Sequence, residues 1–224
     1  MDTRRITGLA LIVPPVLAII GWLVVGIVVL DGVGPDKPTE YIGKVGANST
    51  AITYLFPLIT LLFLMAIGGI GYIKKSMEGG PGSYIASFAW FLIILGAAGQ
   101  LGEVAATLAL ADASDKAAVA AAAVAAAGGN PLTDPIVVSL QTVASSMYAA
   151  GQAVGAVTTA FSMLGFALIG VGIFQQKNFS PLVAGLMIVA GIFTLVMCLI
   201  DYENQLIAIG YIGVVVSFVC LGVS

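Results

Sequence analysis

Glu103 is the strongest candidate for a functional residue in this chain of 224 residues, because it is a carboxylate inside an apolar segment. Gly96, Gln100 and Thr107 lie on the same helical face as Glu103, since the four positions recur at i, i+4, i+7 and i+11. A carboxylate within a bilayer is costly, so by default it marks a functional site. We expect this polar stripe to face a helix bundle or an aqueous cavity.

A second polar stripe follows in the next long apolar segment and starts at the same expected depth. We expect Gln152 or Tyr148 to hydrogen-bond Glu103, and Asp201 or Tyr202 to approach from the outer turn. The candidate intramembrane site, which would open to the outer face, is Glu103, Gln100, Gln152, Tyr148 and Asp201. The second stripe consists of Ser145, Tyr148, Gln152, Gly155, Thr159 and Ser162.

Three kinds of chemistry are open to Glu103. It could hold helices together through hydrogen bonds of about 0.6 to 2 kcal/mol each. It could bind a cation or a proton in a transporter. Intramembrane catalysis is the weakest of the three, because one carboxylate without His, Lys or a second acid beside it makes a poor catalytic set. We therefore expect a protein that is not an enzyme.

The composition excludes several classes of function. The chain contains no histidine, which removes the usual ligand for haem, zinc and copper and the ordinary general base. We expect neither a metal site nor a cofactor. With eight Lys and Arg residues and a net charge of -3, the chain lacks the basic surface that nucleic acid requires.

Hydropathy predicts an all-α, polytopic integral membrane protein. Hydrophobic residues make up 60% of the chain and charged residues 8%, against roughly 25% charged residues in soluble domains. Six apolar segments predict one transmembrane domain, a six-transmembrane-helix bundle over residues 1–224. The expected spans are about 8–30, 51–73, 84–110, 147–174, 181–200 and 205–222.

An extra alanine-rich helix is expected outside the membrane, at about 114–128 between spans three and four, with Ser114 as its N-cap and Gly128 as its C-cap. Asp134-Pro135 then reads as a cap followed by proline at the first helical position. The helix that it opens could run unbroken to Gln175, twice the hydrocarbon thickness, so its first third must protrude. Ser180-Pro181 repeats the same signal before the fifth span.

The loop from Asp31 to Thr50 is expected to be polar and irregular, with Asn48, Ser49 and Thr50 as candidate N-caps for the second span. Basic residues favour cytoplasmic N- and C-termini, since five of the eight then lie inside. Most acidic residues then lie outside. That negative face could attract a cation or a basic partner, or serve only as a solvated surface.

Small residues predict faces on which helices pack closely. Gly96, Gly99 and Gly102 recur every three residues, while Gly151 and Gly155 form a Gly-x-x-x-Gly pattern. Such faces pack helices within one bundle or between chains. Besides the lipid bilayer, the expected partners are therefore other membrane subunits or a second copy of this chain.

The order of signals also resembles a known family. It includes Tyr41-Ile42-Gly43-Lys44-Val45 with Asn48 before the second span, Glu103 in the third, and Phe179-Ser180-Pro181 before the fifth. The chain thereby resembles bacterial and archaeal six-span membrane proteins catalogued as a domain of unknown function. The resemblance implies topology and no mechanism.

Two functions remain as predictions. The first is a structural or accessory subunit of a larger membrane assembly, favoured by the scarcity of intramembrane polar groups and by the glycine faces. The second is a small-solute or cation/proton transporter with an outward-facing polar site around Glu103.

Overall fold

The computed structural model describes residues 3–177 and 179–223, and it confirms the all-α class for these residues. Seven α-helices and one π-helix follow one another along the chain. They are α1 (Thr3–Leu23), η1 (Val24–Val29), α2 (Pro38–Ala47), α3 (Ser49–Ser76), α4 (Ser83–Ala126), α5 (Pro135–Gln176), α6 (Pro181–Ile200) and α7 (Ile207–Val223).

Among the described residues, five segments are long and apolar enough to cross a membrane: Arg5–Val29, Ser49–Ser76, Ser83–Ala126, Pro135–Gln176 and Pro181–Ile200. The helix α7 is equally apolar but has 17 residues. Large apolar side chains are exposed on these helices, as expected where the surrounding solvent is lipid. The chain is therefore an integral membrane protein whose helix surfaces contact the bilayer.

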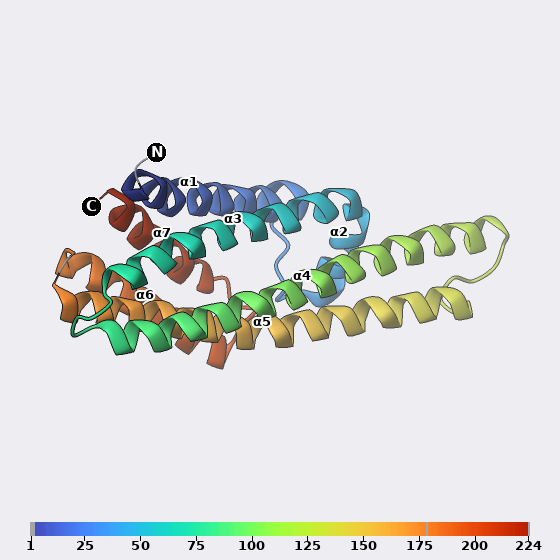
Figure 1. The fold of residues 1–224 in the computed structure, drawn as a ribbon. Coiled ribbons are helices and arrows are strands. Elements are labelled where there is room, and N and C mark those ends of the chain that lie inside the picture. Colours follow the sequence, from blue (N-terminus) through green and yellow to red (C-terminus); the bar gives the residue numbers. More distant parts are fainter. Residues whose placement is uncertain (1–2, 178, 224) are drawn as a thin grey trace.

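The helices form a bundle around a long α4–α5 hairpin (Figure 1). The helix α3 packs against α4 of this hairpin, and α1 packs against α3 and α7 (Figure 1). The helix α6 packs against α5, and α7 joins α6 to α1 near the end where the chain begins and ends. At the opposite end the hairpin extends well beyond the other helices. At 1.5 Å per residue, the 44 residues of α4 span about 66 Å, roughly twice the hydrocarbon thickness.

The expected break before the alanine-rich segment does not occur, because α4 runs continuously through Ser114. Ser114 is therefore not an N-cap. Its hydroxyl donates to the carbonyl of Ile42 in α2 at 3.0 Å. The helix continues because alanine has the highest helix propensity and because Lys116 pairs with Asp112 at 2.8 Å on the same face.

The expected C-cap of this segment is correct. Gly128 has φ +76, a left-handed conformation that glycine adopts without strain. The amide of Gly128 bonds the carbonyl of Ala125, and the amide of Gly129 bonds that of Val124, both at 3.0 Å. This pair of bonds is a Schellman motif and ends α4.

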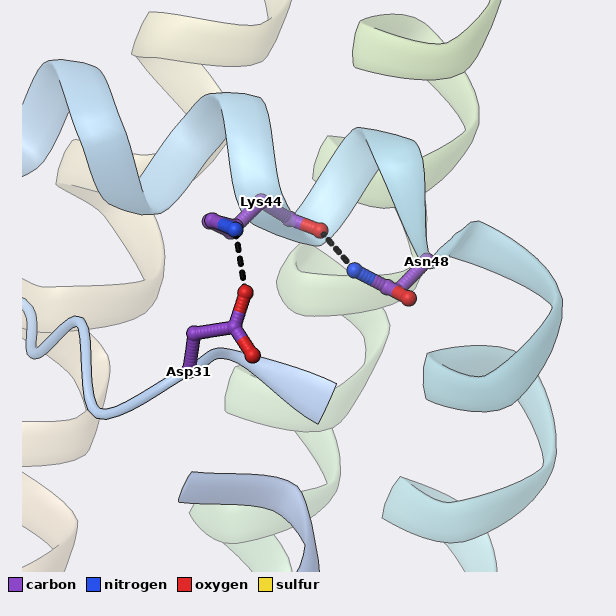
Figure 2. Close-up of polar contacts among 3 residues, drawn as sticks. All are labelled: Asp31, Lys44 and Asn48. Atoms are coloured by element: carbon purple, nitrogen blue, oxygen red, sulfur yellow. Dashed lines mark hydrogen bonds and ion pairs between the residues drawn. The ribbon is translucent and has the colours of Figure 1, made fainter. Parts of the chain in front are cut away.

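The prediction of an irregular loop before the second span was incomplete, because part of it forms α2. Pro38 occupies its first turn, where the missing N–H costs nothing. Asn48 caps no helix with its side chain; its Nδ2 donates to the carbonyl of Lys44 at 3.0 Å. Lys44 also forms an ion pair with Asp31, which ties α2 to the chain leaving η1 (Figure 2).

The two cap-then-proline signals differ in their capping contacts. Asp134 caps α5 as expected, with its Oδ1 accepting from the amides of Ile136 at 2.9 Å and Val137 at 3.1 Å. Ser180 precedes α6 but makes no side-chain capping bond, although Pro181 opens that helix as expected. The long unbroken helix expected after Asp134 is present as α5.

Candidate functional site

A cavity of about 550 Å³ lies between α1–η1, α2, α3, α4, α5 and α7. Two loops border it: the segment Gly32–Pro35 after η1, and the turn Tyr202–Gln205 between α6 and α7. Its size is within the range of pockets that bind small organic molecules, roughly 300 to 1,000 Å³. Four of the five candidate residues chosen from the sequence line it: Gln100, Glu103, Tyr148 and Gln152.

Glu103 lies where α4 faces α5, and its Oε1 accepts a hydrogen bond from the hydroxyl of Tyr202 at 3.3 Å. Gly155 on α5 leaves room for both groups. A Cβ added there would lie 2.6 Å from the Tyr202 hydroxyl and 2.8 Å from the Glu103 Cδ. The glycine is therefore part of the site, because any larger residue would displace the carboxylate.

Hydroxyl groups continue from Glu103 into the bundle. The Tyr202 hydroxyl lies 3.4 Å from the Oγ1 of Thr159, which in turn lies 2.9 Å from the hydroxyl of Tyr211 on α7. Thr159 is fully buried. This series of hydroxyl contacts holds Tyr202 beside Glu103 and links α5 to α7.

Gln152 brings an unpartnered acceptor to the same cavity. Its Oε1 is buried and has no hydrogen-bond partner among the described residues. Gln152 lies three residues before Gly155, so it is on the face of α5 that meets Glu103. A buried oxygen without a donor is destabilising by roughly 1 to 3 kcal/mol, unless a ligand or water supplies one.

Tyr148 lies at the border of the cavity, where its hydroxyl contacts two loops. Two acceptors lie within hydrogen-bonding distance of it, the carbonyl of Pro35 at 2.6 Å and Oε1 of Glu203 at 2.7 Å, and they share its single proton. The expected bond from Tyr148 to Glu103 is thus replaced by these two. They hold the Gly32–Pro35 loop against the α6–α7 turn.

Asp201 does not join the residues that line the cavity. It is exposed, and its carboxylate accepts from the amide of Glu203 at 3.2 Å and from Nδ2 of Asn204 at 3.4 Å. These local bonds shape the turn. Its neighbours Tyr202 and Glu203 enter the site in its place.

Aromatic side chains form much of the cavity wall, and most of them were not chosen from the sequence. Three pairs of rings pack together, with centroid separations of 5.1 Å for Trp22–Phe56, 5.8 Å for Tyr41–Tyr148 and 6.1 Å for Phe63–Tyr211. All six of these residues line the cavity. They come from five different helices, so no local sequence pattern connects them.

The charge of the cavity is one-sided. Glu103 and Glu203 line it, while none of the described lining residues is Lys or Arg.

Burial, with a further contribution from the charge of Glu103, raises the pKa of Tyr41 in α2 to about 12. Burial likewise raises the pKa of Tyr202 in the turn well above its ordinary value. Both phenols therefore stay neutral hydroxyl groups at physiological pH.

No group of three or more Cys, Asp or Glu side chains with metal-binding geometry occurs in the described part of the chain. Glu103 alone supplies two oxygens, fewer than the roughly six to eight that Mg²⁺ or Ca²⁺ takes.

The glycines that were expected to pack α4 against α5 differ in how much space surrounds them. A Cβ on Gly96 would lie 2.6 Å from the carbonyl oxygen of Thr158, and one on Gly99 would overlap the Thr158 side chain. A Cβ on Gly102 or Gly151 would meet its nearest neighbour at 3.6 and 3.5 Å, an ordinary contact. The close approach of α4 to α5 therefore depends on Gly96 and Gly99.

No protein-family model, curated protein or solved structure matches this chain. The geometry of the cavity therefore carries the functional argument.

Proposed function

We propose that the chain is a six-span membrane transporter that binds a small solute or cation in the cavity around Glu103. The observation that supports this most is a cavity between the apolar helices. Its described lining combines the Glu103 carboxylate, no Lys or Arg, and a buried amide oxygen of Gln152 without a hydrogen-bond partner. A structural role for Glu103 would require neighbouring helices to satisfy it. Among the described residues, its one side-chain hydrogen bond comes from the Tyr202 hydroxyl at 3.3 Å, on a turn.

The six-span topology includes α7 as the last span. Its 17 residues reach about 26 Å, close to the roughly 30 Å of the hydrocarbon core. The two chain termini lie at one end of the bundle, which an even number of spans requires (Figure 1). With the termini in the cytoplasm, as the basic residues favour, the Gly32–Pro35 and Tyr202–Gln205 loops border the cavity on the outer side.

Cysteine accessibility tests transport without knowledge of the solute. Cys198 and Cys220 are first replaced by alanine, and Gln100→Cys is then introduced as a reporter in the cavity wall. A membrane-impermeant thiol reagent is applied to right-side-out and to inverted vesicles. A transporter exposes its site to each side in turn, so we expect labelling in both preparations. Lys177→Cys, at the exposed end of α5, serves as the one-sided control.

The outcomes separate the candidate functions. Labelling of Gln100→Cys from both sides supports transport, while labelling from the outer side alone indicates a binding site that does not cross the membrane. Protection from both sides would contradict the proposal and leave the accessory role.

One observation favours that accessory role as a second candidate. The α4–α5 hairpin continues far beyond the other helices, and at about 66 Å α4 is roughly twice as long as a span requires. Such an extension offers a surface for another subunit. Native mass spectrometry of the gently extracted protein tests this: a second chain at fixed stoichiometry would support it, and a monomer or homo-oligomer would not.

A further inference from the structure

Two acceptors at the cavity have unused capacity. Among the described residues, the Oε1 of Gln152 has no donor, and the carboxylate of Glu103 accepts one hydrogen bond, from Tyr202. A carboxylate offers roughly four acceptor positions. The ligand that completes this site must therefore bring donors and a positive charge.

The walls indicate that the positive charge belongs to an organic molecule. The cavity is large, about 550 Å³, and mainly apolar. The paired rings of Phe63 and Tyr211 and of Trp22 and Phe56 line it. Aromatic faces attract ammonium groups within about 6 Å of the ring centre. A bare metal ion would find few charged ligands, because Glu103 and Glu203 are the carboxylates among the described lining residues and Tyr148 already bonds Glu203.

The same cavity reaches the lateral, helix-exposed surface of the bundle between η1 and α7. Ile27 on η1 and Ile212 on α7 both line the cavity and are 66% and 49% exposed. Trp22, in the last helical turn of α1, also lines the cavity and is 44% exposed. Because these residues lie on apolar, lipid-facing surfaces, the opening leads toward the hydrocarbon region.

Helix geometry explains why the opening lies there. At the end with the termini, α1 and α7 pack so closely that a Cβ on Gly8 would lie 2.6 Å from the carbonyl oxygen of Gly222. Farther along the chain, α1 gives way to the π-helix Val24–Val29, which is wider than an α-helix and is typical of functional sites. The rim residues Ile27 and Ile212 lie at this second end, where η1 and α7 border the cavity.

We propose, on the basis of the transport function above, that the ligand is a hydrophobic organic cation whose ammonium group binds Glu103 and Gln152. Its apolar body lies against the aromatic pairs, and it reaches the site from the lipid between η1 and α7. A phospholipid headgroup fits less well, because its phosphate would meet no Lys or Arg among the described residues that line the cavity.

A matched series of ligands tests this class. The probes are 1-naphthylmethylammonium, 1-naphthylmethanol and 1-naphthylacetate, which share an aromatic body and carry a cation, a neutral hydroxyl and an anion. Binding is measured by equilibrium dialysis against the full chain in phosphatidylcholine nanodiscs, with empty nanodiscs subtracted. We expect the ammonium to bind roughly tenfold or more tightly than the alcohol, and the carboxylate not to bind above the empty discs.

Two variants connect the preference to named residues. Glu103→Gln should lower the affinity for the ammonium by roughly tenfold or more and leave that for the alcohol unchanged. Glu78→Gln is the control, because it makes the same chemical change at an exposed residue paired with Lys74 at 3.0 Å, far from the cavity lining. Gln152→Leu should weaken the ammonium and not its N-trimethyl form, which cannot donate a hydrogen bond.

Several results would overturn the proposal. The first is equal affinity for the ammonium and the alcohol, and the second is an unchanged ammonium affinity in folded Glu103→Gln. The third is loss of binding when phosphatidylethanolamine replaces phosphatidylcholine, because that result would assign the site to a lipid headgroup. If Glu103→Gln does not fold, Gln152→Leu decides in its place, and an unchanged ammonium affinity there contradicts the proposal. Thiol labelling of Gln100→Cys from both sides without an ammonium preference would leave transport standing and reject this ligand class alone.

Discussion

Replacing Gly96 with alanine tests whether the close approach of α4 to α5 depends on this position. A Cβ at Gly96 would lie 2.6 Å from the carbonyl oxygen of Thr158 and 2.9 Å from the amide nitrogen of Ser162. Both are backbone atoms of α5, so no side chain can rotate away and the helices must separate. Overpacking of this kind is destabilising by about 1 to 3 kcal/mol, which the higher helix propensity of alanine offsets by about 1 kcal/mol.

Gly102→Ala is the matched control in the same helix. Its Cβ would meet the Cγ1 of Val154 at 3.6 Å, an ordinary contact, so the gain of about 1 kcal/mol in helix propensity is left without a packing penalty. The free energy of unfolding of Gly96→Ala should therefore be about 1 to 3 kcal/mol lower than that of Gly102→Ala. Unfolding by SDS in mixed micelles, followed by tryptophan fluorescence, measures both. Equal free energies would refute the reasoning, because intrinsic propensity alone would then account for both variants.

Three further changes test individual contacts. Glu103→Gln should change the free energy of unfolding by less than about 1 kcal/mol, because the carboxylate makes a single weak hydrogen bond to the α6–α7 turn among the described residues. A loss above about 3 kcal/mol in SDS unfolding would restore the helix-binding role. Tyr148→Phe removes the hydroxyl that joins two loops and should lower stability by about 1 to 2 kcal/mol, with faster hydrogen exchange in both loops; unchanged exchange would show that the hydroxyl does not hold them. Asp134→Ala should cost about 1 kcal/mol and speed amide exchange in the first turn of α5, whereas Ser180→Ala, which removes no capping bond, should change neither; similar effects of the two would contradict this assignment.

The parts of the site that lie within one helix could be predicted from sequence. Gln100 and Glu103 share a face of α4, and Gln152 and Gly155 share a face of α5, because helical periodicity fixes both relations. What periodicity cannot give is the partner across space. Tyr202 reaches Glu103 because of the path of the α6–α7 turn, and its neighbour Asp201 points to solvent for the same reason.

The glycine spacing shows a second limit. Residues three apart on an α-helix are rotated by about 60° from one another, so Gly96 and Gly102 lie about 120° apart around α4. A repeat of three thus cannot keep all its members on one interface. The structure accordingly gives Gly96 a close backbone neighbour and leaves ordinary space at Gly102.

Local capping signals failed where a tertiary contact competed with them. Ser114 follows Asp112 in a pattern typical of a helix start, yet the serine hydroxyl finds its acceptor in the carbonyl of Ile42 on α2. Because α2 was itself expected to be irregular, that acceptor was not visible from the sequence. The contact between α2 and α4 gives the Ser114 hydroxyl a partner, while alanine propensity and the Lys116–Asp112 pair keep α4 continuous through this position.

The cavity also explains why the membrane interior contains these polar groups at all. Several hydroxyl side chains elsewhere in the bundle bond carbonyls of their own helix, as Thr194 does to Ala190 at 2.8 Å, although the buried hydroxyl of Ser162 has no partner among the described residues. Gln152 has no such bond, and Glu103 depends on a turn rather than on a neighbouring helix. Groups that served only to join helices would be expected to satisfy one another across the helix interface, because the surrounding lipid offers no alternative partner. Their unused acceptors border a cavity in which a cationic ligand can satisfy both.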